Sequence, residues 1–125
     1  YLYQRDLLEY SKRRGIVITA YCPVARGRIT EDQLLIKIAR NHAKTPAQVS
    51  LKWLIQHGTT VIPKSTGRHL QENMDIFGWR LTEKEMEAID SIKVHERIVN
   101  PTFTNMPFFD KIPRSVIRAF SGLIR

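Results

Sequence analysis

A lysine and two hydroxyl side chains follow a short apolar run in the segment VIPKSTGRHLQEN, residues 61–73. Lys64, Ser65 and Thr66 supply an ammonium group and two hydroxyls. A helix is predicted to begin within the next few residues, and the first N–H groups of a helix have no partner inside it. Donors of this kind, gathered at a helix N-terminus, are suited to holding a phosphate. The segment therefore predicts a phosphate-binding turn.

A second segment has the same plan. Residues 16–27, IVITAYCPVARG, form an apolar run that opens into a loop. Two strand-then-loop units in one chain favour a parallel α/β fold, in which a phosphate-bearing ligand lies across the carboxyl ends of the strands.

The elements that position these loops can be predicted from periodicity and caps. Strands are expected over 16–21 and 59–63, and the β-branched, nearly uncharged first one is typical of a strand buried on both faces. A helix is expected over 4–14, ending at Gly15. Two further helices are expected over 30–42 and 45–57, and both begin with a capping box. Another helix is expected where Leu70, Met74 and Phe77 recur at helical spacing, and Gly78 ends it. A last helix is expected from a capping box at Thr82 to Ile92.

This order, α-β-α-α-β-α-α, contains only two strands. Parallel strands need neighbours on both edges and helices on both faces, so the pattern indicates the later part of a larger barrel or sheet. The chain also starts without Met or a signal peptide, as if cut from something longer. Beyond residue 93 the pattern weakens into a long loop, and 111–125 form a basic tail.

Composition narrows the function classes. With 42% hydrophobic and 26% charged residues, the chain of 125 residues reads as a globular domain without a membrane-spanning run. The net charge of +8 favours anionic ligands, but the 20 Lys and Arg are spread out and not interleaved with aromatics, which argues against nucleic acid. Cys22 is the only cysteine, which excludes an internal disulfide and fits a reducing, cytoplasmic location.

The motifs together resemble the aldo-keto reductases. LLEYSKRRGIVITAYCPVARG, KTPAQVSLKWLIQHGTTVIPKST, HLQEN and LTEKEMEAID keep their order and spacing over about residues 1–110, the expected barrel portion. The ending HERIVNP is similar to prokaryotic members that reduce diketo-sugar acids and small oxoaldehydes. The resemblance implies the C-terminal part of a TIM (β/α)8 barrel with NADPH across its strand ends.

For the first loop, the resemblance implies that Tyr21 stacks on the nicotinamide ring of the cofactor. It places the main chain of the loop along the pyrophosphate, at Cys22, Pro23, Val24, Ala25, Arg26 and Gly27. Ala25 restricts a backbone that glycine would leave free. Arg26 is either a charge on the pyrophosphate or a solvated surface side chain, and the sequence leaves both open.

For the second loop, the resemblance implies that Lys64, Ser65 and Thr66 hold the 2′-phosphate that distinguishes NADPH from NADH. Glu72 and Asn73 match the family's contacts to the adenine. The family usually has an arginine a few residues after this lysine, but the turn that follows Lys64 is one residue shorter here. Either Arg68 takes its place, or His69 does with a weaker, pH-dependent charge that would relax the preference for NADPH.

The resemblance leaves no residue for catalysis, because the family's catalytic aspartate, tyrosine, lysine and histidine lie on strands that these segments do not match. The predicted function is therefore the cofactor-binding part of an NAD(P)H-dependent reductase of aldehydes and ketones, inactive alone and needing the N-terminal half of the barrel. The alternative is a non-catalytic NADPH-binding or regulatory module. No metal site is expected, since His42, His57 and His95 lack ligand spacing, and Glu83, Glu85 and Glu87 read as a solvated helix face.

Overall fold

The computed structural model describes residues 3–93. The predicted loop and tail beyond residue 93, His95 included, lie outside the described residues. The elements, in chain order, are α1 (Arg5–Arg13), β1 (Thr19–Ala20), the 3-10 helix η1 (Ala25–Glu31), α2 (Gln33–Asn41), α3 (Pro46–Gln56), β2 (Thr60–Val61), α4 (Arg68–Met74) and α5 (Glu83–Asp90). The predicted order is confirmed, with η1 added in the first loop.

The two strands run parallel, as predicted, with Thr19 opposite Thr60 and Ala20 opposite Val61. The Thr60 N–H donates to the Ile18 carbonyl at 2.9 Å, and the Thr19 and Thr60 hydroxyls are 2.7 Å apart. Because the strands are parallel, the loops that follow them leave from the same edge. This pairing brings the two predicted ligand loops to one end of the molecule.

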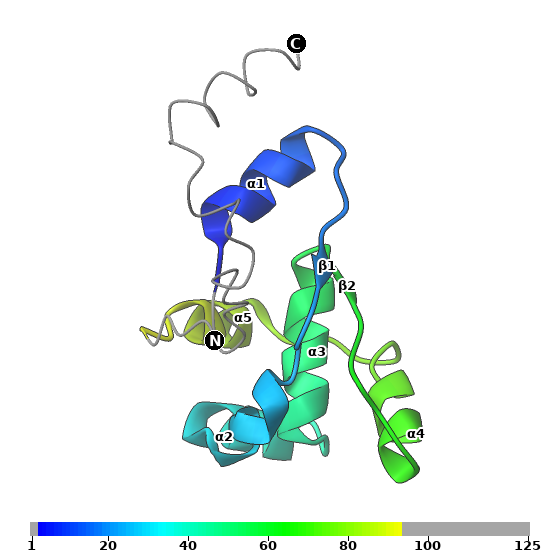
Figure 1. Ribbon diagram of the computed structural model, residues 1–125. Helices are drawn as coiled ribbons and strands as arrows, with labels where there is room; N and C mark the ends of the chain where they lie inside the picture. Colours follow the sequence, from blue (N-terminus) through cyan, green and yellow to red (C-terminus); the bar gives the residue numbers. More distant parts are fainter. Residues whose placement is uncertain (1–2, 94–125) are drawn as a thin grey trace, which may run out of the picture.

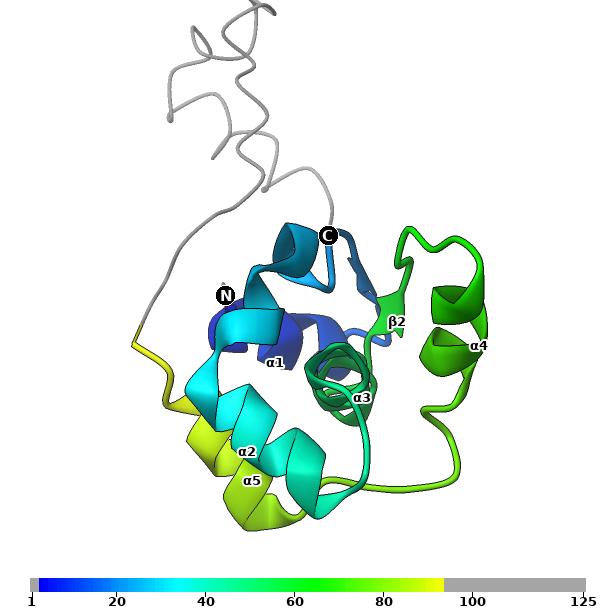
Figure 2. The same ribbon diagram turned by 90° about the horizontal axis from the view of Figure 1, so that it is seen from below.

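Helix α3 is central to the fold. Seen end-on in Figure 2, it is surrounded by α1, α2, α4 and the strands, while α5 lies beside α2. Val49 and Leu51 of α3 are fully buried. Val49 belongs to one apolar cluster with residues of η1, α2, α5 and the segment before α5, namely Ala25, Ile29, Leu35, Ile38, Ala39, Leu81 and Ile89. This core fixes the loop after β1, because η1 packs into it.

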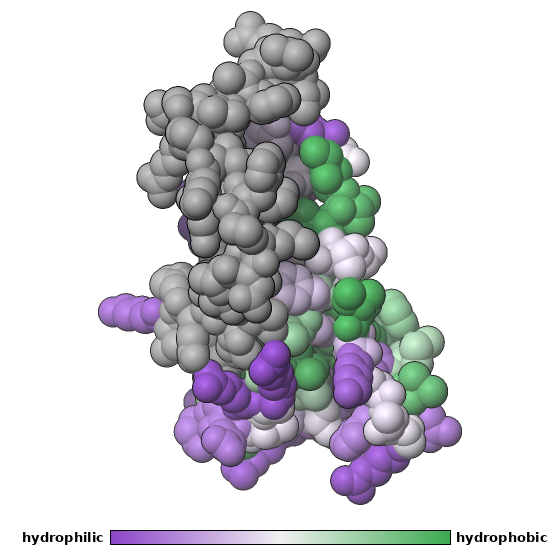
Figure 3. Space-filling model, viewed as in Figure 1, coloured by the Kyte–Doolittle hydropathy of each residue, from purple (hydrophilic) through white to green (hydrophobic). Residues whose placement is uncertain are grey.

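The strand predictions were wrong in length and in burial. Each strand keeps only two residues, and Val17 and Ile62, which flank them, are 67% and 60% exposed. Apolar side chains accordingly form a green run down the side of the molecule that carries the strands (Figures 1 and 3). Parallel strands are buried when further strands and helices cover them, and the described residues contain no such cover.

Two of the three predicted capping boxes are confirmed, at Thr45–Gln48 with Pro46 in the first turn and at Thr82–Glu85. The one at Thr30 was wrong. The N-cap of α2 is Asp32, whose carboxylate accepts the Leu34 and Leu35 N–H groups at 3.0 and 3.1 Å. A carboxylate is an equally good cap, and Thr30 instead donates to the Gly27 carbonyl within η1.

Candidate functional site

A cavity of about 350 Å³ lies where the two loops meet. From the loop after β2 it is lined by Lys64, Ser65 and Thr66, and from α4 by His69 and Asn73. The facing wall comes from the first loop, η1 and the start of α3, namely Val24, Gly27, Ile29, Thr30 and Ala47. Seven of the fourteen predicted cofactor residues therefore share one cavity, although the two loops are about forty residues apart.

The hydroxyl of Ser65 is the most informative group in this cavity. Its oxygen is buried and has no hydrogen-bond partner among the described residues. A buried hydroxyl without a partner loses free energy relative to one in water, so such groups are rare unless a ligand or water completes them. Ser65 stands between an ammonium group and a second hydroxyl, and this donor set suits a phosphate.

The first loop takes a sharp left-handed path. Cys22, Ala25 and Arg26 have φ of 52°, 50° and 54°, and Gly27 follows at 88°. Side chains with a Cβ are disfavoured there by about 1–2 kcal/mol each, so the surrounding contacts must hold the loop in place. One such contact is the Ser50 hydroxyl of α3, which donates to the Pro23 carbonyl at 2.7 Å.

The other predicted residues of the first loop do not line this cavity. Cys22, Pro23 and Ala25 line a separate, smaller apolar cavity of about 110 Å³ against α3 and α5. Tyr21 is 54% exposed at the end of β1, and Arg26 is exposed as well. The prediction that these five residues contact the cofactor remains a prediction, and their side chains are not gathered with Lys64.

The structure distinguishes His69 from Arg68. His69 lines the cavity, and its Nδ1 lies 2.9 Å from Oε2 of Glu72 one turn later. Arg68 and Glu72 are not among the lining residues. Of the two alternatives for the basic position after Lys64, the geometry favours His69.

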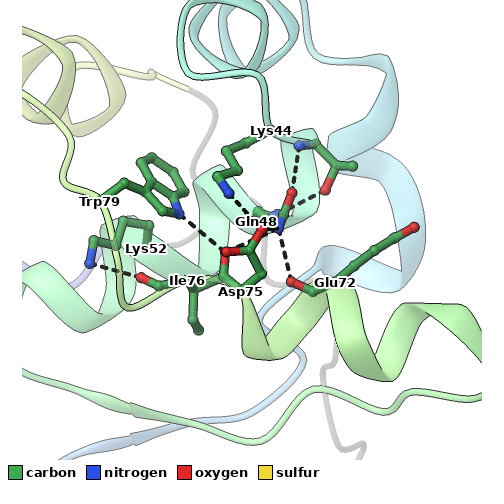
Figure 4. A network of polar contacts seen from close by, with 8 residues as sticks. Lys44, Gln48, Lys52, Glu72, Asp75, Ile76 and Trp79 are labelled. Carbon is green, nitrogen blue, oxygen red and sulfur yellow. Dashed lines mark hydrogen bonds and ion pairs between the residues drawn. The ribbon is translucent and has the colours of Figure 1, made fainter.

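Helix α4 is held in place by the side chain of Gln48 from α3 (Figure 4). The Gln48 Nε2 donates to the carbonyls of Glu72 and Asp75 at 2.9 and 3.1 Å, and its Oε1 accepts the Thr45 N–H at 2.9 Å. One buried amide thus caps α3 and ties the end of α4 to it. The predicted continuation of α4 to Phe77 was wrong, since the helix ends at Met74 and Phe77 is 68% exposed.

Two ionisable groups beside this amide have shifted pKa values. A hydrogen bond from Lys44 lowers the pKa of Asp75, which burial opposes. Burial lowers the pKa of Lys52, and nearby Arg80 adds to the effect. Lys52 donates to the Ile76 carbonyl at 2.8 Å and lies under the Trp79 ring, so these shifts belong to the support of α4 rather than to the cavity (Figure 4).

Sequence reasoning missed three residues that line the cavity: Ile29, Thr30 and Ala47. Thr30 was interpreted as a helix cap, and Asp32 two residues later was the signal against that interpretation. Ala47 carries no local signal, because only the packing of α3 brings it to the cavity. Among residues 3–93, no group of three His, Cys, Asp or Glu side chains is placed to hold a metal ion.

Two parallel strands with helices packed on one side, and with both following loops at one edge, have the architecture of part of a (β/α)8 barrel. The model of the aldo/keto reductase family matches residues 2–94, and the chain belongs to that family.

Among characterised relatives, the glyoxal reductase of Bacillus subtilis (strain 168) is 40% identical over 98 residues, which cover 78% of this chain and 36% of the relative. The 9,11-endoperoxide prostaglandin H2 reductase of Trypanosoma cruzi (strain CL Brener) is 43% identical over 99 residues, 76% of this chain and 35% of that protein. The chain thus spans about a third of the length of these relatives.

Solved structures agree with this. A putative 2,5-diketo-D-gluconic acid reductase B superposes with a TM-score of 0.76 at 40% identity, over 82% of this chain and 37% of that one. A Gox0644 mutant in complex with NADPH superposes with a TM-score of 0.68 at 40% identity, over 71% and 33%. In the described part of the chain, no helix is both long and apolar enough to cross a bilayer.

Proposed function

We propose that this chain is the cofactor-binding part of an NADPH-dependent reductase of aldehydes and ketones. The observation that carries the proposal is the buried, unpartnered hydroxyl of Ser65, which follows Lys64, precedes Thr66 and lines the cavity with them. Lys64, Ser65 and Thr66 would hold the 2′-phosphate of the cofactor, with Asn73 toward the adenine. The NADPH complex of a Gox0644 mutant, 40% identical to this chain, supports this choice of ligand.

When bound, the reduced nicotinamide supplies the hydride that reduces a carbonyl. Tyr21 would stack on the nicotinamide ring and fix the face that it presents, for which its position at the end of β1 and its exposure leave room. The left-handed turn at Ala25 and Arg26 would carry the main chain along the pyrophosphate. The proposed role of these residues is to bind and orient the cofactor, with no proton donor among them.

The binding experiment uses adenosine 2′,5′-bisphosphate, and adenosine 5′-monophosphate as the comparison that lacks the 2′-phosphate. Calorimetric titration should give tighter binding of the bisphosphate. Lys64→Met and Ser65→Ala should each reduce that preference, Lys64→Met by about 1.5–3 kcal/mol, the contribution of a charge-assisted hydrogen bond. Lys37→Met removes an exposed lysine of α2 and is the matched control. Equal binding of both nucleotides would contradict the proposal.

We further propose that the uncovered strands pack against the other βα units of the barrel, and that turnover needs them. Support comes from Ile16, Val17, Tyr21 and Ile62, all more than half exposed, and from relatives about three times longer. Co-expression with the first six βα units of the Bacillus subtilis glyoxal reductase should give a complex in which these side chains are protected.

NADPH oxidation with glyoxal should then be absent for the chain alone and present for the complex. Binding of NADPH without turnover in the complex would favour the alternative, a non-catalytic binding module. Turnover by the 125-residue chain alone would overturn the proposal that it lacks a catalytic group.

A further inference from the structure

Ser50 makes a long-range contact from the middle of a helix. A serine hydroxyl in such a position commonly bonds to a carbonyl of its own helix, three or four residues earlier. The hydroxyl of Ser50, in α3, donates instead to the carbonyl of Pro23 at 2.7 Å, and Pro23 is 27 positions away in the loop after β1. Ser50 therefore ties that loop to α3.

The carbonyls on either side of Pro23 are held as well. The Cys22 carbonyl accepts the Ala25 N–H at 3.0 Å, and the Val24 carbonyl accepts the Gly27 N–H at 2.8 Å. A main chain binds an anion when its N–H groups face the anion and its carbonyl oxygens, which carry partial negative charge, face elsewhere. Since three successive carbonyls of this loop have donors within the protein, the loop is suited to hold an anion with its N–H groups.

The hydrogen bond from Ser50 also sets the direction of the next N–H group. In the described part of the chain the peptide bonds are trans, and in a trans peptide the N–H points opposite to the preceding carbonyl. Because the Pro23 carbonyl is directed at Ser50, the Val24 N–H is directed away from it. Val24 lines the cavity that contains Lys64, and among residues 3–93 no backbone acceptor takes the Val24 N–H.

We propose that Ser50 is a positioning residue for the pyrophosphate of a dinucleotide: it holds the Pro23 carbonyl on α3, and the Val24 N–H thereby donates to a phosphate oxygen. This inference rests on the proposed function and adds to it a residue outside the ligand loops. Ser50 lines the apolar cavity of about 110 Å³ and not the cavity with Lys64, so its replacement removes no group from the phosphate cavity. Its effect on binding passes through the loop.

The test titrates the full chain by calorimetry with two probes. Adenosine 2′,5′-bisphosphate carries the 2′-phosphate and one 5′-phosphate, and 2′-phospho-ADP-ribose adds the second phosphate of the pyrophosphate and a ribose. Ser50→Ala removes the hydroxyl, whereas Ser50→Thr keeps it, and the apolar cavity beside residue 50 has room for the added methyl group. Ser91→Ala is the matched control, because Ser91, at the end of α5, also donates its hydroxyl to a carbonyl, that of Ala88 at 2.8 Å.

In the natural chain 2′-phospho-ADP-ribose should bind more tightly than the bisphosphate. Ser50→Ala should weaken binding of 2′-phospho-ADP-ribose by about threefold to tenfold, the range of one hydrogen bond, and should change binding of the bisphosphate by less than about twofold. Ser50→Thr should restore the natural ratio of the two affinities, and Ser91→Ala should leave it unchanged.

NMR adds a measurement at the proposed donor itself. A hydrogen bond to a phosphate oxygen moves an amide proton downfield. With 2′-phospho-ADP-ribose the Val24 amide proton should move downfield in the natural chain and in Ser50→Thr, but not in Ser50→Ala. A Val24 amide that does not move in the natural chain would overturn the inference without any variant.

The other outcomes are distinct. An unchanged ratio of affinities in Ser50→Ala would overturn this inference while the proposed function stands. Equal weakening of both probes would also overturn it, because a general loss of structure has that effect. No preference of the natural chain for the bisphosphate over adenosine 5′-monophosphate would overturn the proposed function and this inference with it. Circular dichroism checks folding, and since alanine favours a helix more than serine does, Ser50→Ala should unfold within a few degrees of the natural chain.

Discussion

His42, at the end of α2, and Glu85, in α5, are joined by a hydrogen bond with 2.9 Å between Nε2 and Oε2. The two residues are 43 positions apart, and both side chains are mostly buried. The same carboxylate accepts the Thr82 N–H at 2.9 Å in the capping box of α5. Glu85 was predicted to be a solvated residue, and that prediction was wrong, because one face of α5 packs on α2.

Glu85 should make the stability of the chain sensitive to acid. Burial raises the pKa of Glu85, but hydrogen bonds from Thr82 and His42 outweigh it, and the net pKa is below the usual 4.5. A carboxylate with a lowered folded-state pKa contributes stability above its unfolded pKa and loses it as the pH falls through the folded one. The free energy of unfolding in urea should therefore decline below about pH 4.5, and less steeply in Glu85→Gln.

At pH 7 Glu85→Gln should cost about 1 kcal/mol, since a charge-assisted hydrogen bond becomes a neutral one. Glu87→Gln, exposed on the same helix, is the control and should change neither stability nor its pH dependence. Identical acid profiles for the two variants would show that the pair with His42 does not hold α5.

Gln48→Ala should be among the most destabilising single substitutions. The residue is 4% exposed, and its removal takes one donor from each of the two carbonyls at the end of α4 and the acceptor from the Thr45 N–H. We expect a loss of about 2–4 kcal/mol in the free energy of unfolding. Gln33→Ala is the comparison, because its exposed amide reaches only the Glu31 carbonyl at 3.4 Å. A Gln48→Ala cost no larger than that of Gln33→Ala would contradict the anchoring role.

Arg26 offers a test of the left-handed turn. Arg26→Ala and Arg26→Gly both remove the guanidinium, and they differ only in the Cβ atom at a φ of 54°. The glycine variant should therefore be more stable than the alanine variant by about 1 kcal/mol in urea unfolding. An alanine variant that is equally stable would indicate that the turn relaxes out of the left-handed region.

Val17 and Val49 are two valines that differ in burial, and comparing them tests whether the exposed side of the strands packs against other βα units. Val17 is 67% exposed and Val49 is fully buried. Val17→Thr should change the free energy of unfolding by less than about 0.5 kcal/mol, whereas Val49→Thr buries a hydroxyl and should cost about 1–3 kcal/mol. In the complex with the remaining βα units, Val17→Thr should become costly, because the proposed packing buries that residue. An unchanged cost in the complex would contradict the packing.

Features that depend on neighbouring residues could be predicted from the sequence. The caps at Thr45 and Thr82 form as predicted, because each capping box joins residues only three positions apart. The order of the elements follows from periodicity, since each helix or strand carries its own apolar pattern, and the parallel direction of the strands was predicted from that alternating order. The turn Lys64–Ser65–Thr66 after the second strand was found in the same way.

Features that depend on packing over long sequence separations were decided only by the tertiary structure. Pairing of β1 with β2 brings Val24 to the same cavity as Lys64. The hydrogen bond from Gln48 holds α4 against α3, and in that position of α4 His69 lines the cavity and Arg68 does not. The burial of the Ser65 hydroxyl and the exposure of Val17 likewise depend on what surrounds them. Local patterns specify which groups are available, but the energy of burying or pairing a group depends on partners that the chain brings together only when it folds.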